Sequence, residues 1–117
     1  NQNLLFRLGE LIAFVECAGA LARRAAQAAD GTLPPKASER LDPAATAAAS
    51  RVFSRHAALR VAHDGVGLLI GAAPPQTIDV AELTAQVGLA PILAAQAGMA
   101  NDMDDVSTSV YAAAQSR

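Results

Sequence analysis

Apolar residues recur at three- and four-residue intervals through the first thirty positions of the chain. This spacing puts side chains on one face of an α-helix and excludes a strand. Asp30 is followed by Gly31, which takes the left-handed conformation at a helix end without strain. The pattern therefore predicts a long helix over about residues 3–30. Its apolar face consists of Leu4, Leu8, Leu11, Val15, Ala18, Ala22 and Ala25, with Leu5 and Ile12 widening the stripe.

A second long helix is predicted over about residues 42–70, after an exposed connection over 31–41 that contains paired prolines. Asp42 is a favourable N-cap, and Pro43 fits the first helical position, where the missing N–H would have no partner. Gly65 and Gly67 either weaken the last turns or let another backbone approach closely. One stripe of this helix holds Val52, His56, Leu59, His63, Val66 and Ile70.

The remaining third of the chain predicts shorter helices. Asp79 and Glu82 have the spacing of a capping arrangement, and Gly88 marks a stop, so a helix is expected over 79–87. Pro91 opens a last segment over 91–115, which Gly98 and an acidic run interrupt. This segment is either one bent helix or two.

Together these elements predict an all-α fold, an antiparallel bundle of about four helices of which the first two are long. A length of 117 residues is that of a single domain, here 1–117. Because the chain opens at Asn1 directly into a helical pattern, we expect it to be a piece of a longer protein or a processed form.

The composition indicates which interactions can stabilise such a bundle. Alanine makes up a large share of the 52% hydrophobic content, and aromatic residues make up only 3%. Each buried alanine contributes little, so stability must come from close helix packing and from high helix propensity. We therefore expect this bundle to depend on neighbouring protein surfaces.

Charge and cysteine content narrow the possible partners. A net charge of −2 argues against nucleic-acid binding, and Arg51, Arg55 and Arg60 are expected to be solvated or to cap helices. Cys17 is the single cysteine, which favours a reducing compartment and an inert buried thiol. The sequence shows neither a signal-peptide pattern nor an uninterrupted apolar run of eighteen residues. We expect a cytoplasmic protein without membrane association.

Two histidines are the first candidates for chemistry. His56 and His63 lie seven positions apart, roughly on one helix face, but only Asp64 is near enough to be a further metal ligand, and it points elsewhere. We expect them to lie at a helix interface instead. The run from His63 to Gly67 also resembles loosely the phosphorylated segment of a histidine phosphotransfer bundle, although Asp64 would repel a phosphoryl group.

Three aspartates are the other candidates. Asp102, Asp104 and Asp105 lack the glycine and distal glutamate of a calcium loop, so a solvated helix start is expected. The chain also lacks the motifs of nucleotide-binding loops, serine hydrolases and redox dithiols. We predict no catalytic, cofactor-binding or metal-binding residue in this chain.

Two segments carry a family resemblance: NQNLLFRLGELIAFVECAGALARRA and AATAAASRVFSRHAALRVAHDGVGLLIG, separated by the proline-containing connection. They resemble the C-terminal helical region of acyl-CoA dehydrogenases of the very-long-chain type and of bacterial relatives. That region has a long helix opening on a leucine pair and a Leu-Arg-Leu-type motif, then an alanine-rich helix. The corresponding residues are Leu4, Leu5, Arg7, Leu8 and Glu10, with 44–60 in the second helix.

This resemblance implies a parent enzyme that uses flavin adenine dinucleotide (FAD) to desaturate fatty acyl-CoA thioesters in fatty acid metabolism. It implies a non-catalytic helical domain here, which binds no FAD itself and serves interdomain or intersubunit packing. The catalytic body of the parent and further copies in a homo-oligomer would be its partners. Alternatives are a free-standing helical interaction module and the phosphotransfer bundle. The expected packing interface comprises Leu4, Leu8, Leu11, Val15, Val52, His56, Leu59 and His63.

Overall fold

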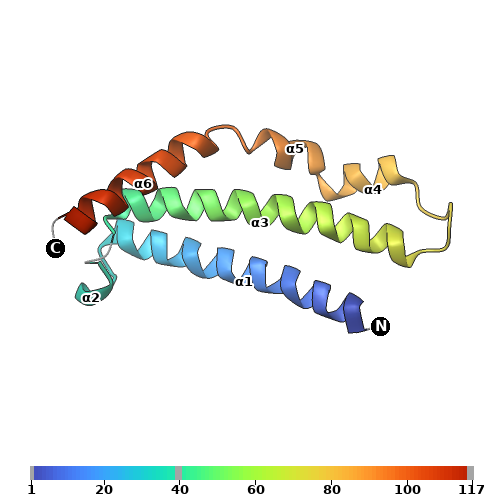
Figure 1. The fold of residues 1–117 in the computed structure, drawn as a ribbon, viewed down its shortest axis with the longest axis horizontal. Coiled ribbons are helices and arrows are strands. Elements are labelled where there is room, and N and C mark those ends of the chain that lie inside the picture. The colour runs from blue at the N-terminus through green and yellow to red at the C-terminus, as the bar shows by residue number, and fades with distance from the viewer. Residues whose placement is uncertain (1, 39–40, 116–117) are drawn as a thin grey trace. The chain divides into compact units, whose positions relative to one another are not determined.

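The computed structural model describes residues 2–38 and 41–115, and within these ranges the chain forms helices and no strand. The all-helical class and the two long helices are thus confirmed (Figure 1). The helices are α1 (Gln2–Asp30), α2 (Pro35–Ser38), α3 (Pro43–Ala72), α4 (Val80–Val87), α5 (Leu89–Ala94) and α6 (Met99–Gln115). Helix α2 is a correction, because it occupies a stretch that was expected to be a non-helical connection.

The ends of the long helices follow from local chemistry. At the end of α1, Gly31 has φ 72°, and the backbone N–H of Thr32 donates to the Gln27 carbonyl at 2.9 Å. At the start of α3, the Asp42 carboxylate accepts from the Ala45 N–H at 2.7 Å, which is the N-cap expected from the Asp-Pro pair. These bonds satisfy backbone groups that a helix terminus leaves without partners.

The last third of the chain divides at two glycines. Asp79 caps α4 by accepting from the Glu82 N–H, and Gly88, with φ 76°, ends this helix. The segment left open between one bent helix and two is two helices, α5 and α6. A turn over residues 95–98 separates them, and it closes on Gly98 with φ 86°. Glycine adopts this left-handed backbone without the steric penalty of a Cβ.

The chain divides into two compact units, and both long helices pass from one to the other. Unit 1 comprises residues 1–16 and 55–97, and unit 2 comprises residues 17–54 and 98–117. Each unit therefore combines part of α1 and part of α3 with a later segment of the chain. The expected single domain over 1–117 stays a prediction.

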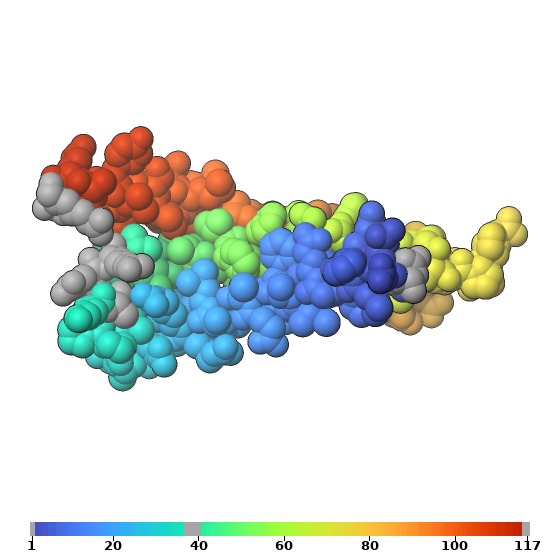
Figure 2. Space-filling view, turned by 60° about the horizontal axis from the view of Figure 1, so that its bottom comes forward, coloured from blue at the N-terminus to red at the C-terminus, as the bar shows by residue number. Residues whose placement is uncertain are grey.

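In unit 1, the start of α1 lies along the end of α3 (Figure 2). The Phe14 ring lies 5.7 Å from the His56 ring, and Leu11 reaches the backbone at Gly65. Later residues of α3 thus meet earlier residues of α1. Helix α3 is also bonded to the segment after α5, because the Arg55 side chain donates to the Ala95 carbonyl at 2.8 Å.

Small side chains dominate the interior, as the composition predicts. The buried apolar residues are Leu11, Ala57, Ala62 and Val66 in unit 1, and Ala45 and Ala48 in unit 2. Polar groups buried beside them have partners, such as the Thr46 hydroxyl, which donates to the Asp42 carbonyl at 2.9 Å. Many larger apolar side chains, such as Leu5, Ile12 and Leu69, remain exposed.

Candidate functional site

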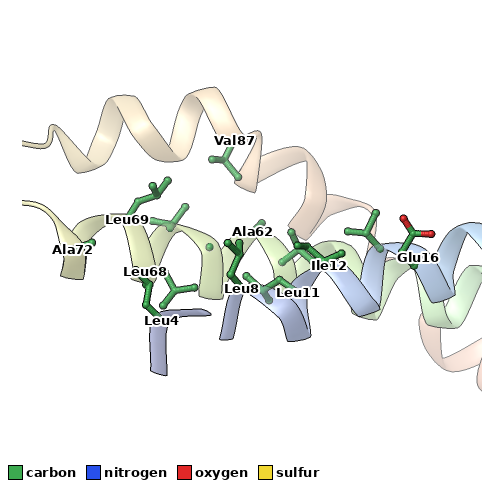
Figure 3. A pocket seen from close by; sticks show the side chains of 14 residues that line it. Leu4, Leu8, Leu11, Ile12, Glu16, Ala62, Leu68, Leu69, Ala72 and Val87 are labelled. Carbon is green, nitrogen blue, oxygen red and sulfur yellow. The ribbon is translucent and has the colours of Figure 1, made fainter. Parts of the chain in front are cut away.

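An apolar groove in unit 1 is the most distinctive surface of the described residues. Figure 3 shows its walls, with α1 on one side and Val87 of α4 on the other, and α3 along the floor. Its volume is about 600 Å³. The α1 wall is made by Leu4, Leu8, Leu11, Ile12, Val15 and Glu16, and seven residues between Val61 and Ala72 make the floor.

The groove is open to solvent although its lining is apolar. Leu8, Ile12 and Val15 keep 48%, 55% and 55% of their surface exposed, and Leu69 on the floor keeps 54%. Glu16 is the one ionisable side chain among the lining residues. Contiguous exposed apolar surface of this kind marks binding sites for apolar partners. The groove has no nucleophile, acid–base pair or cation within its lining, so its chemistry is that of packing.

A second, polar hollow of about 520 Å³ shares Leu11 and Leu68 with the groove but is otherwise lined mainly by charged and polar side chains of α1 and α3. Within this hollow, the Arg60 guanidinium forms two ion pairs. One is with Asp64, one turn along α3, and the other is with Glu10 of α1 at 3.3 Å. The His63 ring nitrogen Nδ1 lies 3.1 Å from Asp64 Oδ1. His63 and then Arg60 hold the pKa of Asp64 below its ordinary value, and Asp64 raises the pKa of Arg60.

Phe14 of α1 contacts two side chains of α3, His56 and Arg60. Its ring meets the His56 ring edge-on at an interplanar angle of 67°, and the Arg60 guanidinium carbon lies 5.6 Å from its centroid. His56 and Arg60 are one turn apart on α3, so the ring of Phe14 contacts both. Edge-on aromatic pairs and cation–π contacts favour this arrangement over simple apolar packing.

The three neighbouring arginines were expected to be solvated or to cap helices; Arg51 and Arg60 are exposed, and Arg55 bonds to the carbonyl at the C-cap of α5. Arg51 pairs in unit 2 with Asp102 of α6 at 2.7 Å, and Asp102 raises the pKa of this guanidinium. Arg55 donates to the Ala95 carbonyl and Arg60 to Glu10. Each arginine therefore connects α3 to another segment of its own unit. Asp102 itself is buried, so the expectation of a solvated acidic helix start is wrong for this residue.

Four residues of the expected packing interface line the groove, namely Leu4, Leu8, Leu11 and Val15. The other four do not. His63 lines the polar hollow, His56 contacts Phe14, Leu59 is half-buried in unit 1, and Val52 is half-buried in unit 2. No pattern in the sequence points to Val87 as a lining residue, because its place opposite α1 depends on how α4 folds back in unit 1.

The two histidines and the cysteine that the sequence analysis considered all lie at the surface. His56 and His63 are exposed, and no group of three or more His, Cys, Asp or Glu side chains in the described ranges is arranged to hold a metal ion. Cys17 is exposed, so the expectation of a buried thiol is wrong.

Comparisons with protein-family models, with curated proteins and with solved structures give no match for this chain. Across the described residues, no helix combines the length and the apolar character needed to cross a lipid bilayer.

Proposed function

We propose that this chain is a non-catalytic helical packing domain, which holds a larger assembly together through the groove of unit 1. The observation that carries the proposal is the groove itself. It has a volume of about 600 Å³, and large apolar side chains of its lining are exposed to solvent. Exposing these side chains to water is unfavourable, and covering them releases roughly 25 cal/mol for each Å² of apolar surface buried. A partner surface that fills the groove would therefore be bound without any chemical step.

We further propose that the parent is a flavin-dependent acyl-CoA dehydrogenase, in which this region packs between domains or subunits as part of an antiparallel bundle. The support is the resemblance of the Leu4 to Glu10 opening and of the alanine-rich helix over 44–60 to the C-terminal region of that family. The groove does not suit the pyrophosphate of FAD, because Glu16 is the one charged residue of its lining. FAD and the catalytic residues are accordingly assigned to the body of the enzyme.

The parent enzyme is tested on the natural polypeptide. Antibodies raised against the 117-residue chain would be used to isolate that polypeptide from its source, for peptide mapping by mass spectrometry and absorption spectroscopy. We expect a polypeptide with an additional flavin-enzyme body, yellow when pure, while the 117-residue chain alone takes up no FAD. A colourless polypeptide with no such body would overturn the dehydrogenase parent and favour the free-standing interaction module.

A further inference from the structure

We propose that His63 is a phosphoacceptor, whose Nε2 atom takes a phosphoryl group from an activated donor, a phosphoramidate or an acyl phosphate. The proposal starts from a chain of contacts along the polar hollow. Glu10 of α1 pairs with Arg60, Arg60 pairs with Asp64, and Asp64 lies within hydrogen-bond distance of His63. His63 does not line the apolar groove, so this site is separate from the packing role proposed above.

The carboxylate of Asp64 decides which ring nitrogen of His63 can react. The Nδ1 atom lies 3.1 Å from Asp64 Oδ1, and an ionised carboxylate only accepts hydrogen bonds, so Nδ1 carries the proton. Asp64 is ionised at neutral pH because His63 and then Arg60 hold its pKa below the ordinary value. In neutral imidazole the second nitrogen then has a free lone pair. Nε2 is therefore the nucleophilic atom.

The ring of His63 is accessible to a donor. Its side chain is 79% exposed. Gly67 lies one turn further along α3 and lines the same hollow, and a Cβ placed there would meet nothing within 4 Å. A further hollow of about 540 Å³ adjoins it, since the two share Arg7, Gly67 and Leu68. A phosphoryl group and its leaving group thus have room beside the ring.

The charges of the hollow suit an anionic donor. The carboxylates of Glu10 and Asp64 both pair with the guanidinium of Arg60. This pairing offsets the repulsion of a phosphoryl group that was expected from Asp64. Arg7 also lines the hollow, and within the described part of the chain it forms no ion pair. Its guanidinium is therefore available to the phosphoryl oxygens, which it binds well.

The transfer needs no further reactant. The Nε2 lone pair attacks phosphorus, and the bond from phosphorus to the leaving atom of the donor breaks. Its electron pair departs with the carboxylate of an acyl phosphate, or with ammonia from the protonated amine of phosphoramidate. The Nδ1 proton stays on the ring, which becomes positively charged. Asp64 stabilises this charge through its contact with Nδ1, as a carboxylate beside an imidazolium does.

The rate and position of phosphorylation test the proposal. The folded chain would be incubated with phosphoramidate and, separately, with acetyl phosphate, and the products followed by mass spectrometry and ³¹P NMR. His56 is the internal comparison, because it is also exposed but contacts the Phe14 ring instead of a carboxylate. A positioned proton partner typically changes rates about 10²–10⁴-fold, and at this exposed site we expect His63 to react at least about tenfold faster than His56. The product should be the Nε2 isomer.

Asp64→Asn tests the role of the carboxylate. This variant should lower the rate at His63 to that at His56 and let the Nδ1 isomer form. Asp104→Asn is the matched control, since it removes an exposed acid from α6, and it should keep the wild-type preference. Arg7→Gln should also slow His63, whereas Arg23→Gln, at an exposed position of the same helix, should not. Circular dichroism would verify that all variants keep their helices.

A preference for His63 with either donor supports the proposal and identifies the donor class. Equal rates at the two histidines with both donors would overturn it. So would an Nδ1 product in the wild type, or an Asp64→Asn variant that keeps the fast rate at His63.

Discussion

The guanidinium of Arg51 on α3 donates three hydrogen bonds to the carboxylate of Asp102 on α6, at 2.7, 3.1 and 3.2 Å. Asp102 is buried, whereas the Arg51 side chain is about half exposed. The carboxylate lies in the first turn of α6, where the helix dipole also favours a negative charge. This pair therefore connects two helices of unit 2 that lie far apart in the sequence.

Replacing Asp102 should destabilise the chain more than replacing any exposed acid. Asp102→Asn removes the charge that the guanidinium contacts and leaves a buried amide with fewer matched partners. Thermal unfolding followed by circular dichroism should show a lower midpoint for Asp102→Asn than for Glu10→Gln, which breaks the exposed pair with Arg60. Equal midpoints for the two variants would show that the Arg51 pair has no special role.

Asp64 should make stability depend on acid pH. Its pKa in the folded chain lies below the ordinary value of 3.8, first because of the His63 hydrogen bond and then because of Arg60. The ionised carboxylate thus stabilises the folded state above pH 3.8, and this contribution is lost as the pH falls through the lower folded-state pKa. Unfolding measured from neutral pH downward should show a shallower acid loss for Asp64→Asn than for the wild type.

The matched control for Asp64 is Asp104→Asn, which removes the same charge from an exposed position on α6. It should retain the wild-type loss of stability below pH 3.8. If both variants gave the same acid dependence, the ion pairs around Asp64 would contribute nothing to folding at neutral pH.

Two glycines should respond to alanine in opposite directions. Gly88 has φ 76° at the end of α4, a conformation in which a Cβ is strained, so Gly88→Ala should cost about 1 kcal/mol of unfolding free energy. Gly67 lies inside α3, and a Cβ added there meets nothing within 4 Å. Gly67→Ala should therefore gain up to about 1 kcal/mol through helix propensity. Urea unfolding of the two variants measures both values, and a loss at Gly67 would point to a required close approach.

Phe14 should be the aromatic residue that matters most for the α1–α3 contact. Phe14→Ala removes a half-buried ring and its edge-on contact with His56, which together should cost roughly 1–2 kcal/mol. Phe6→Ala is the control, because Phe6 is 75% exposed, and its unfolding free energy should stay near that of the wild type. A similar loss at both positions would mean that Phe14 does not anchor α1.

Part of the candidate site follows from the periodicity of α1 alone. The three- and four-residue spacing identifies Leu4, Leu8, Leu11 and Val15 as one apolar face, and all four line the groove. The same reasoning fails on α3, where His56 and His63 share the stripe with Val66 but are exposed while Val66 is buried. This helix packs on two sides, so a single stripe does not describe which residues it buries.

The sequence by itself determined the helical class and several of the helix ends, because these depend on interactions within a few residues. Asp42 and Asp79 cap helices through bonds to backbone N–H groups three positions later, and Gly88 ends one through its own backbone freedom. Only the tertiary structure decided that Asp102 is buried against Arg51, that Cys17 is exposed and that Val87 closes the groove opposite α1. Those outcomes depend on contacts between segments distant in the chain, which local spacing and composition do not encode.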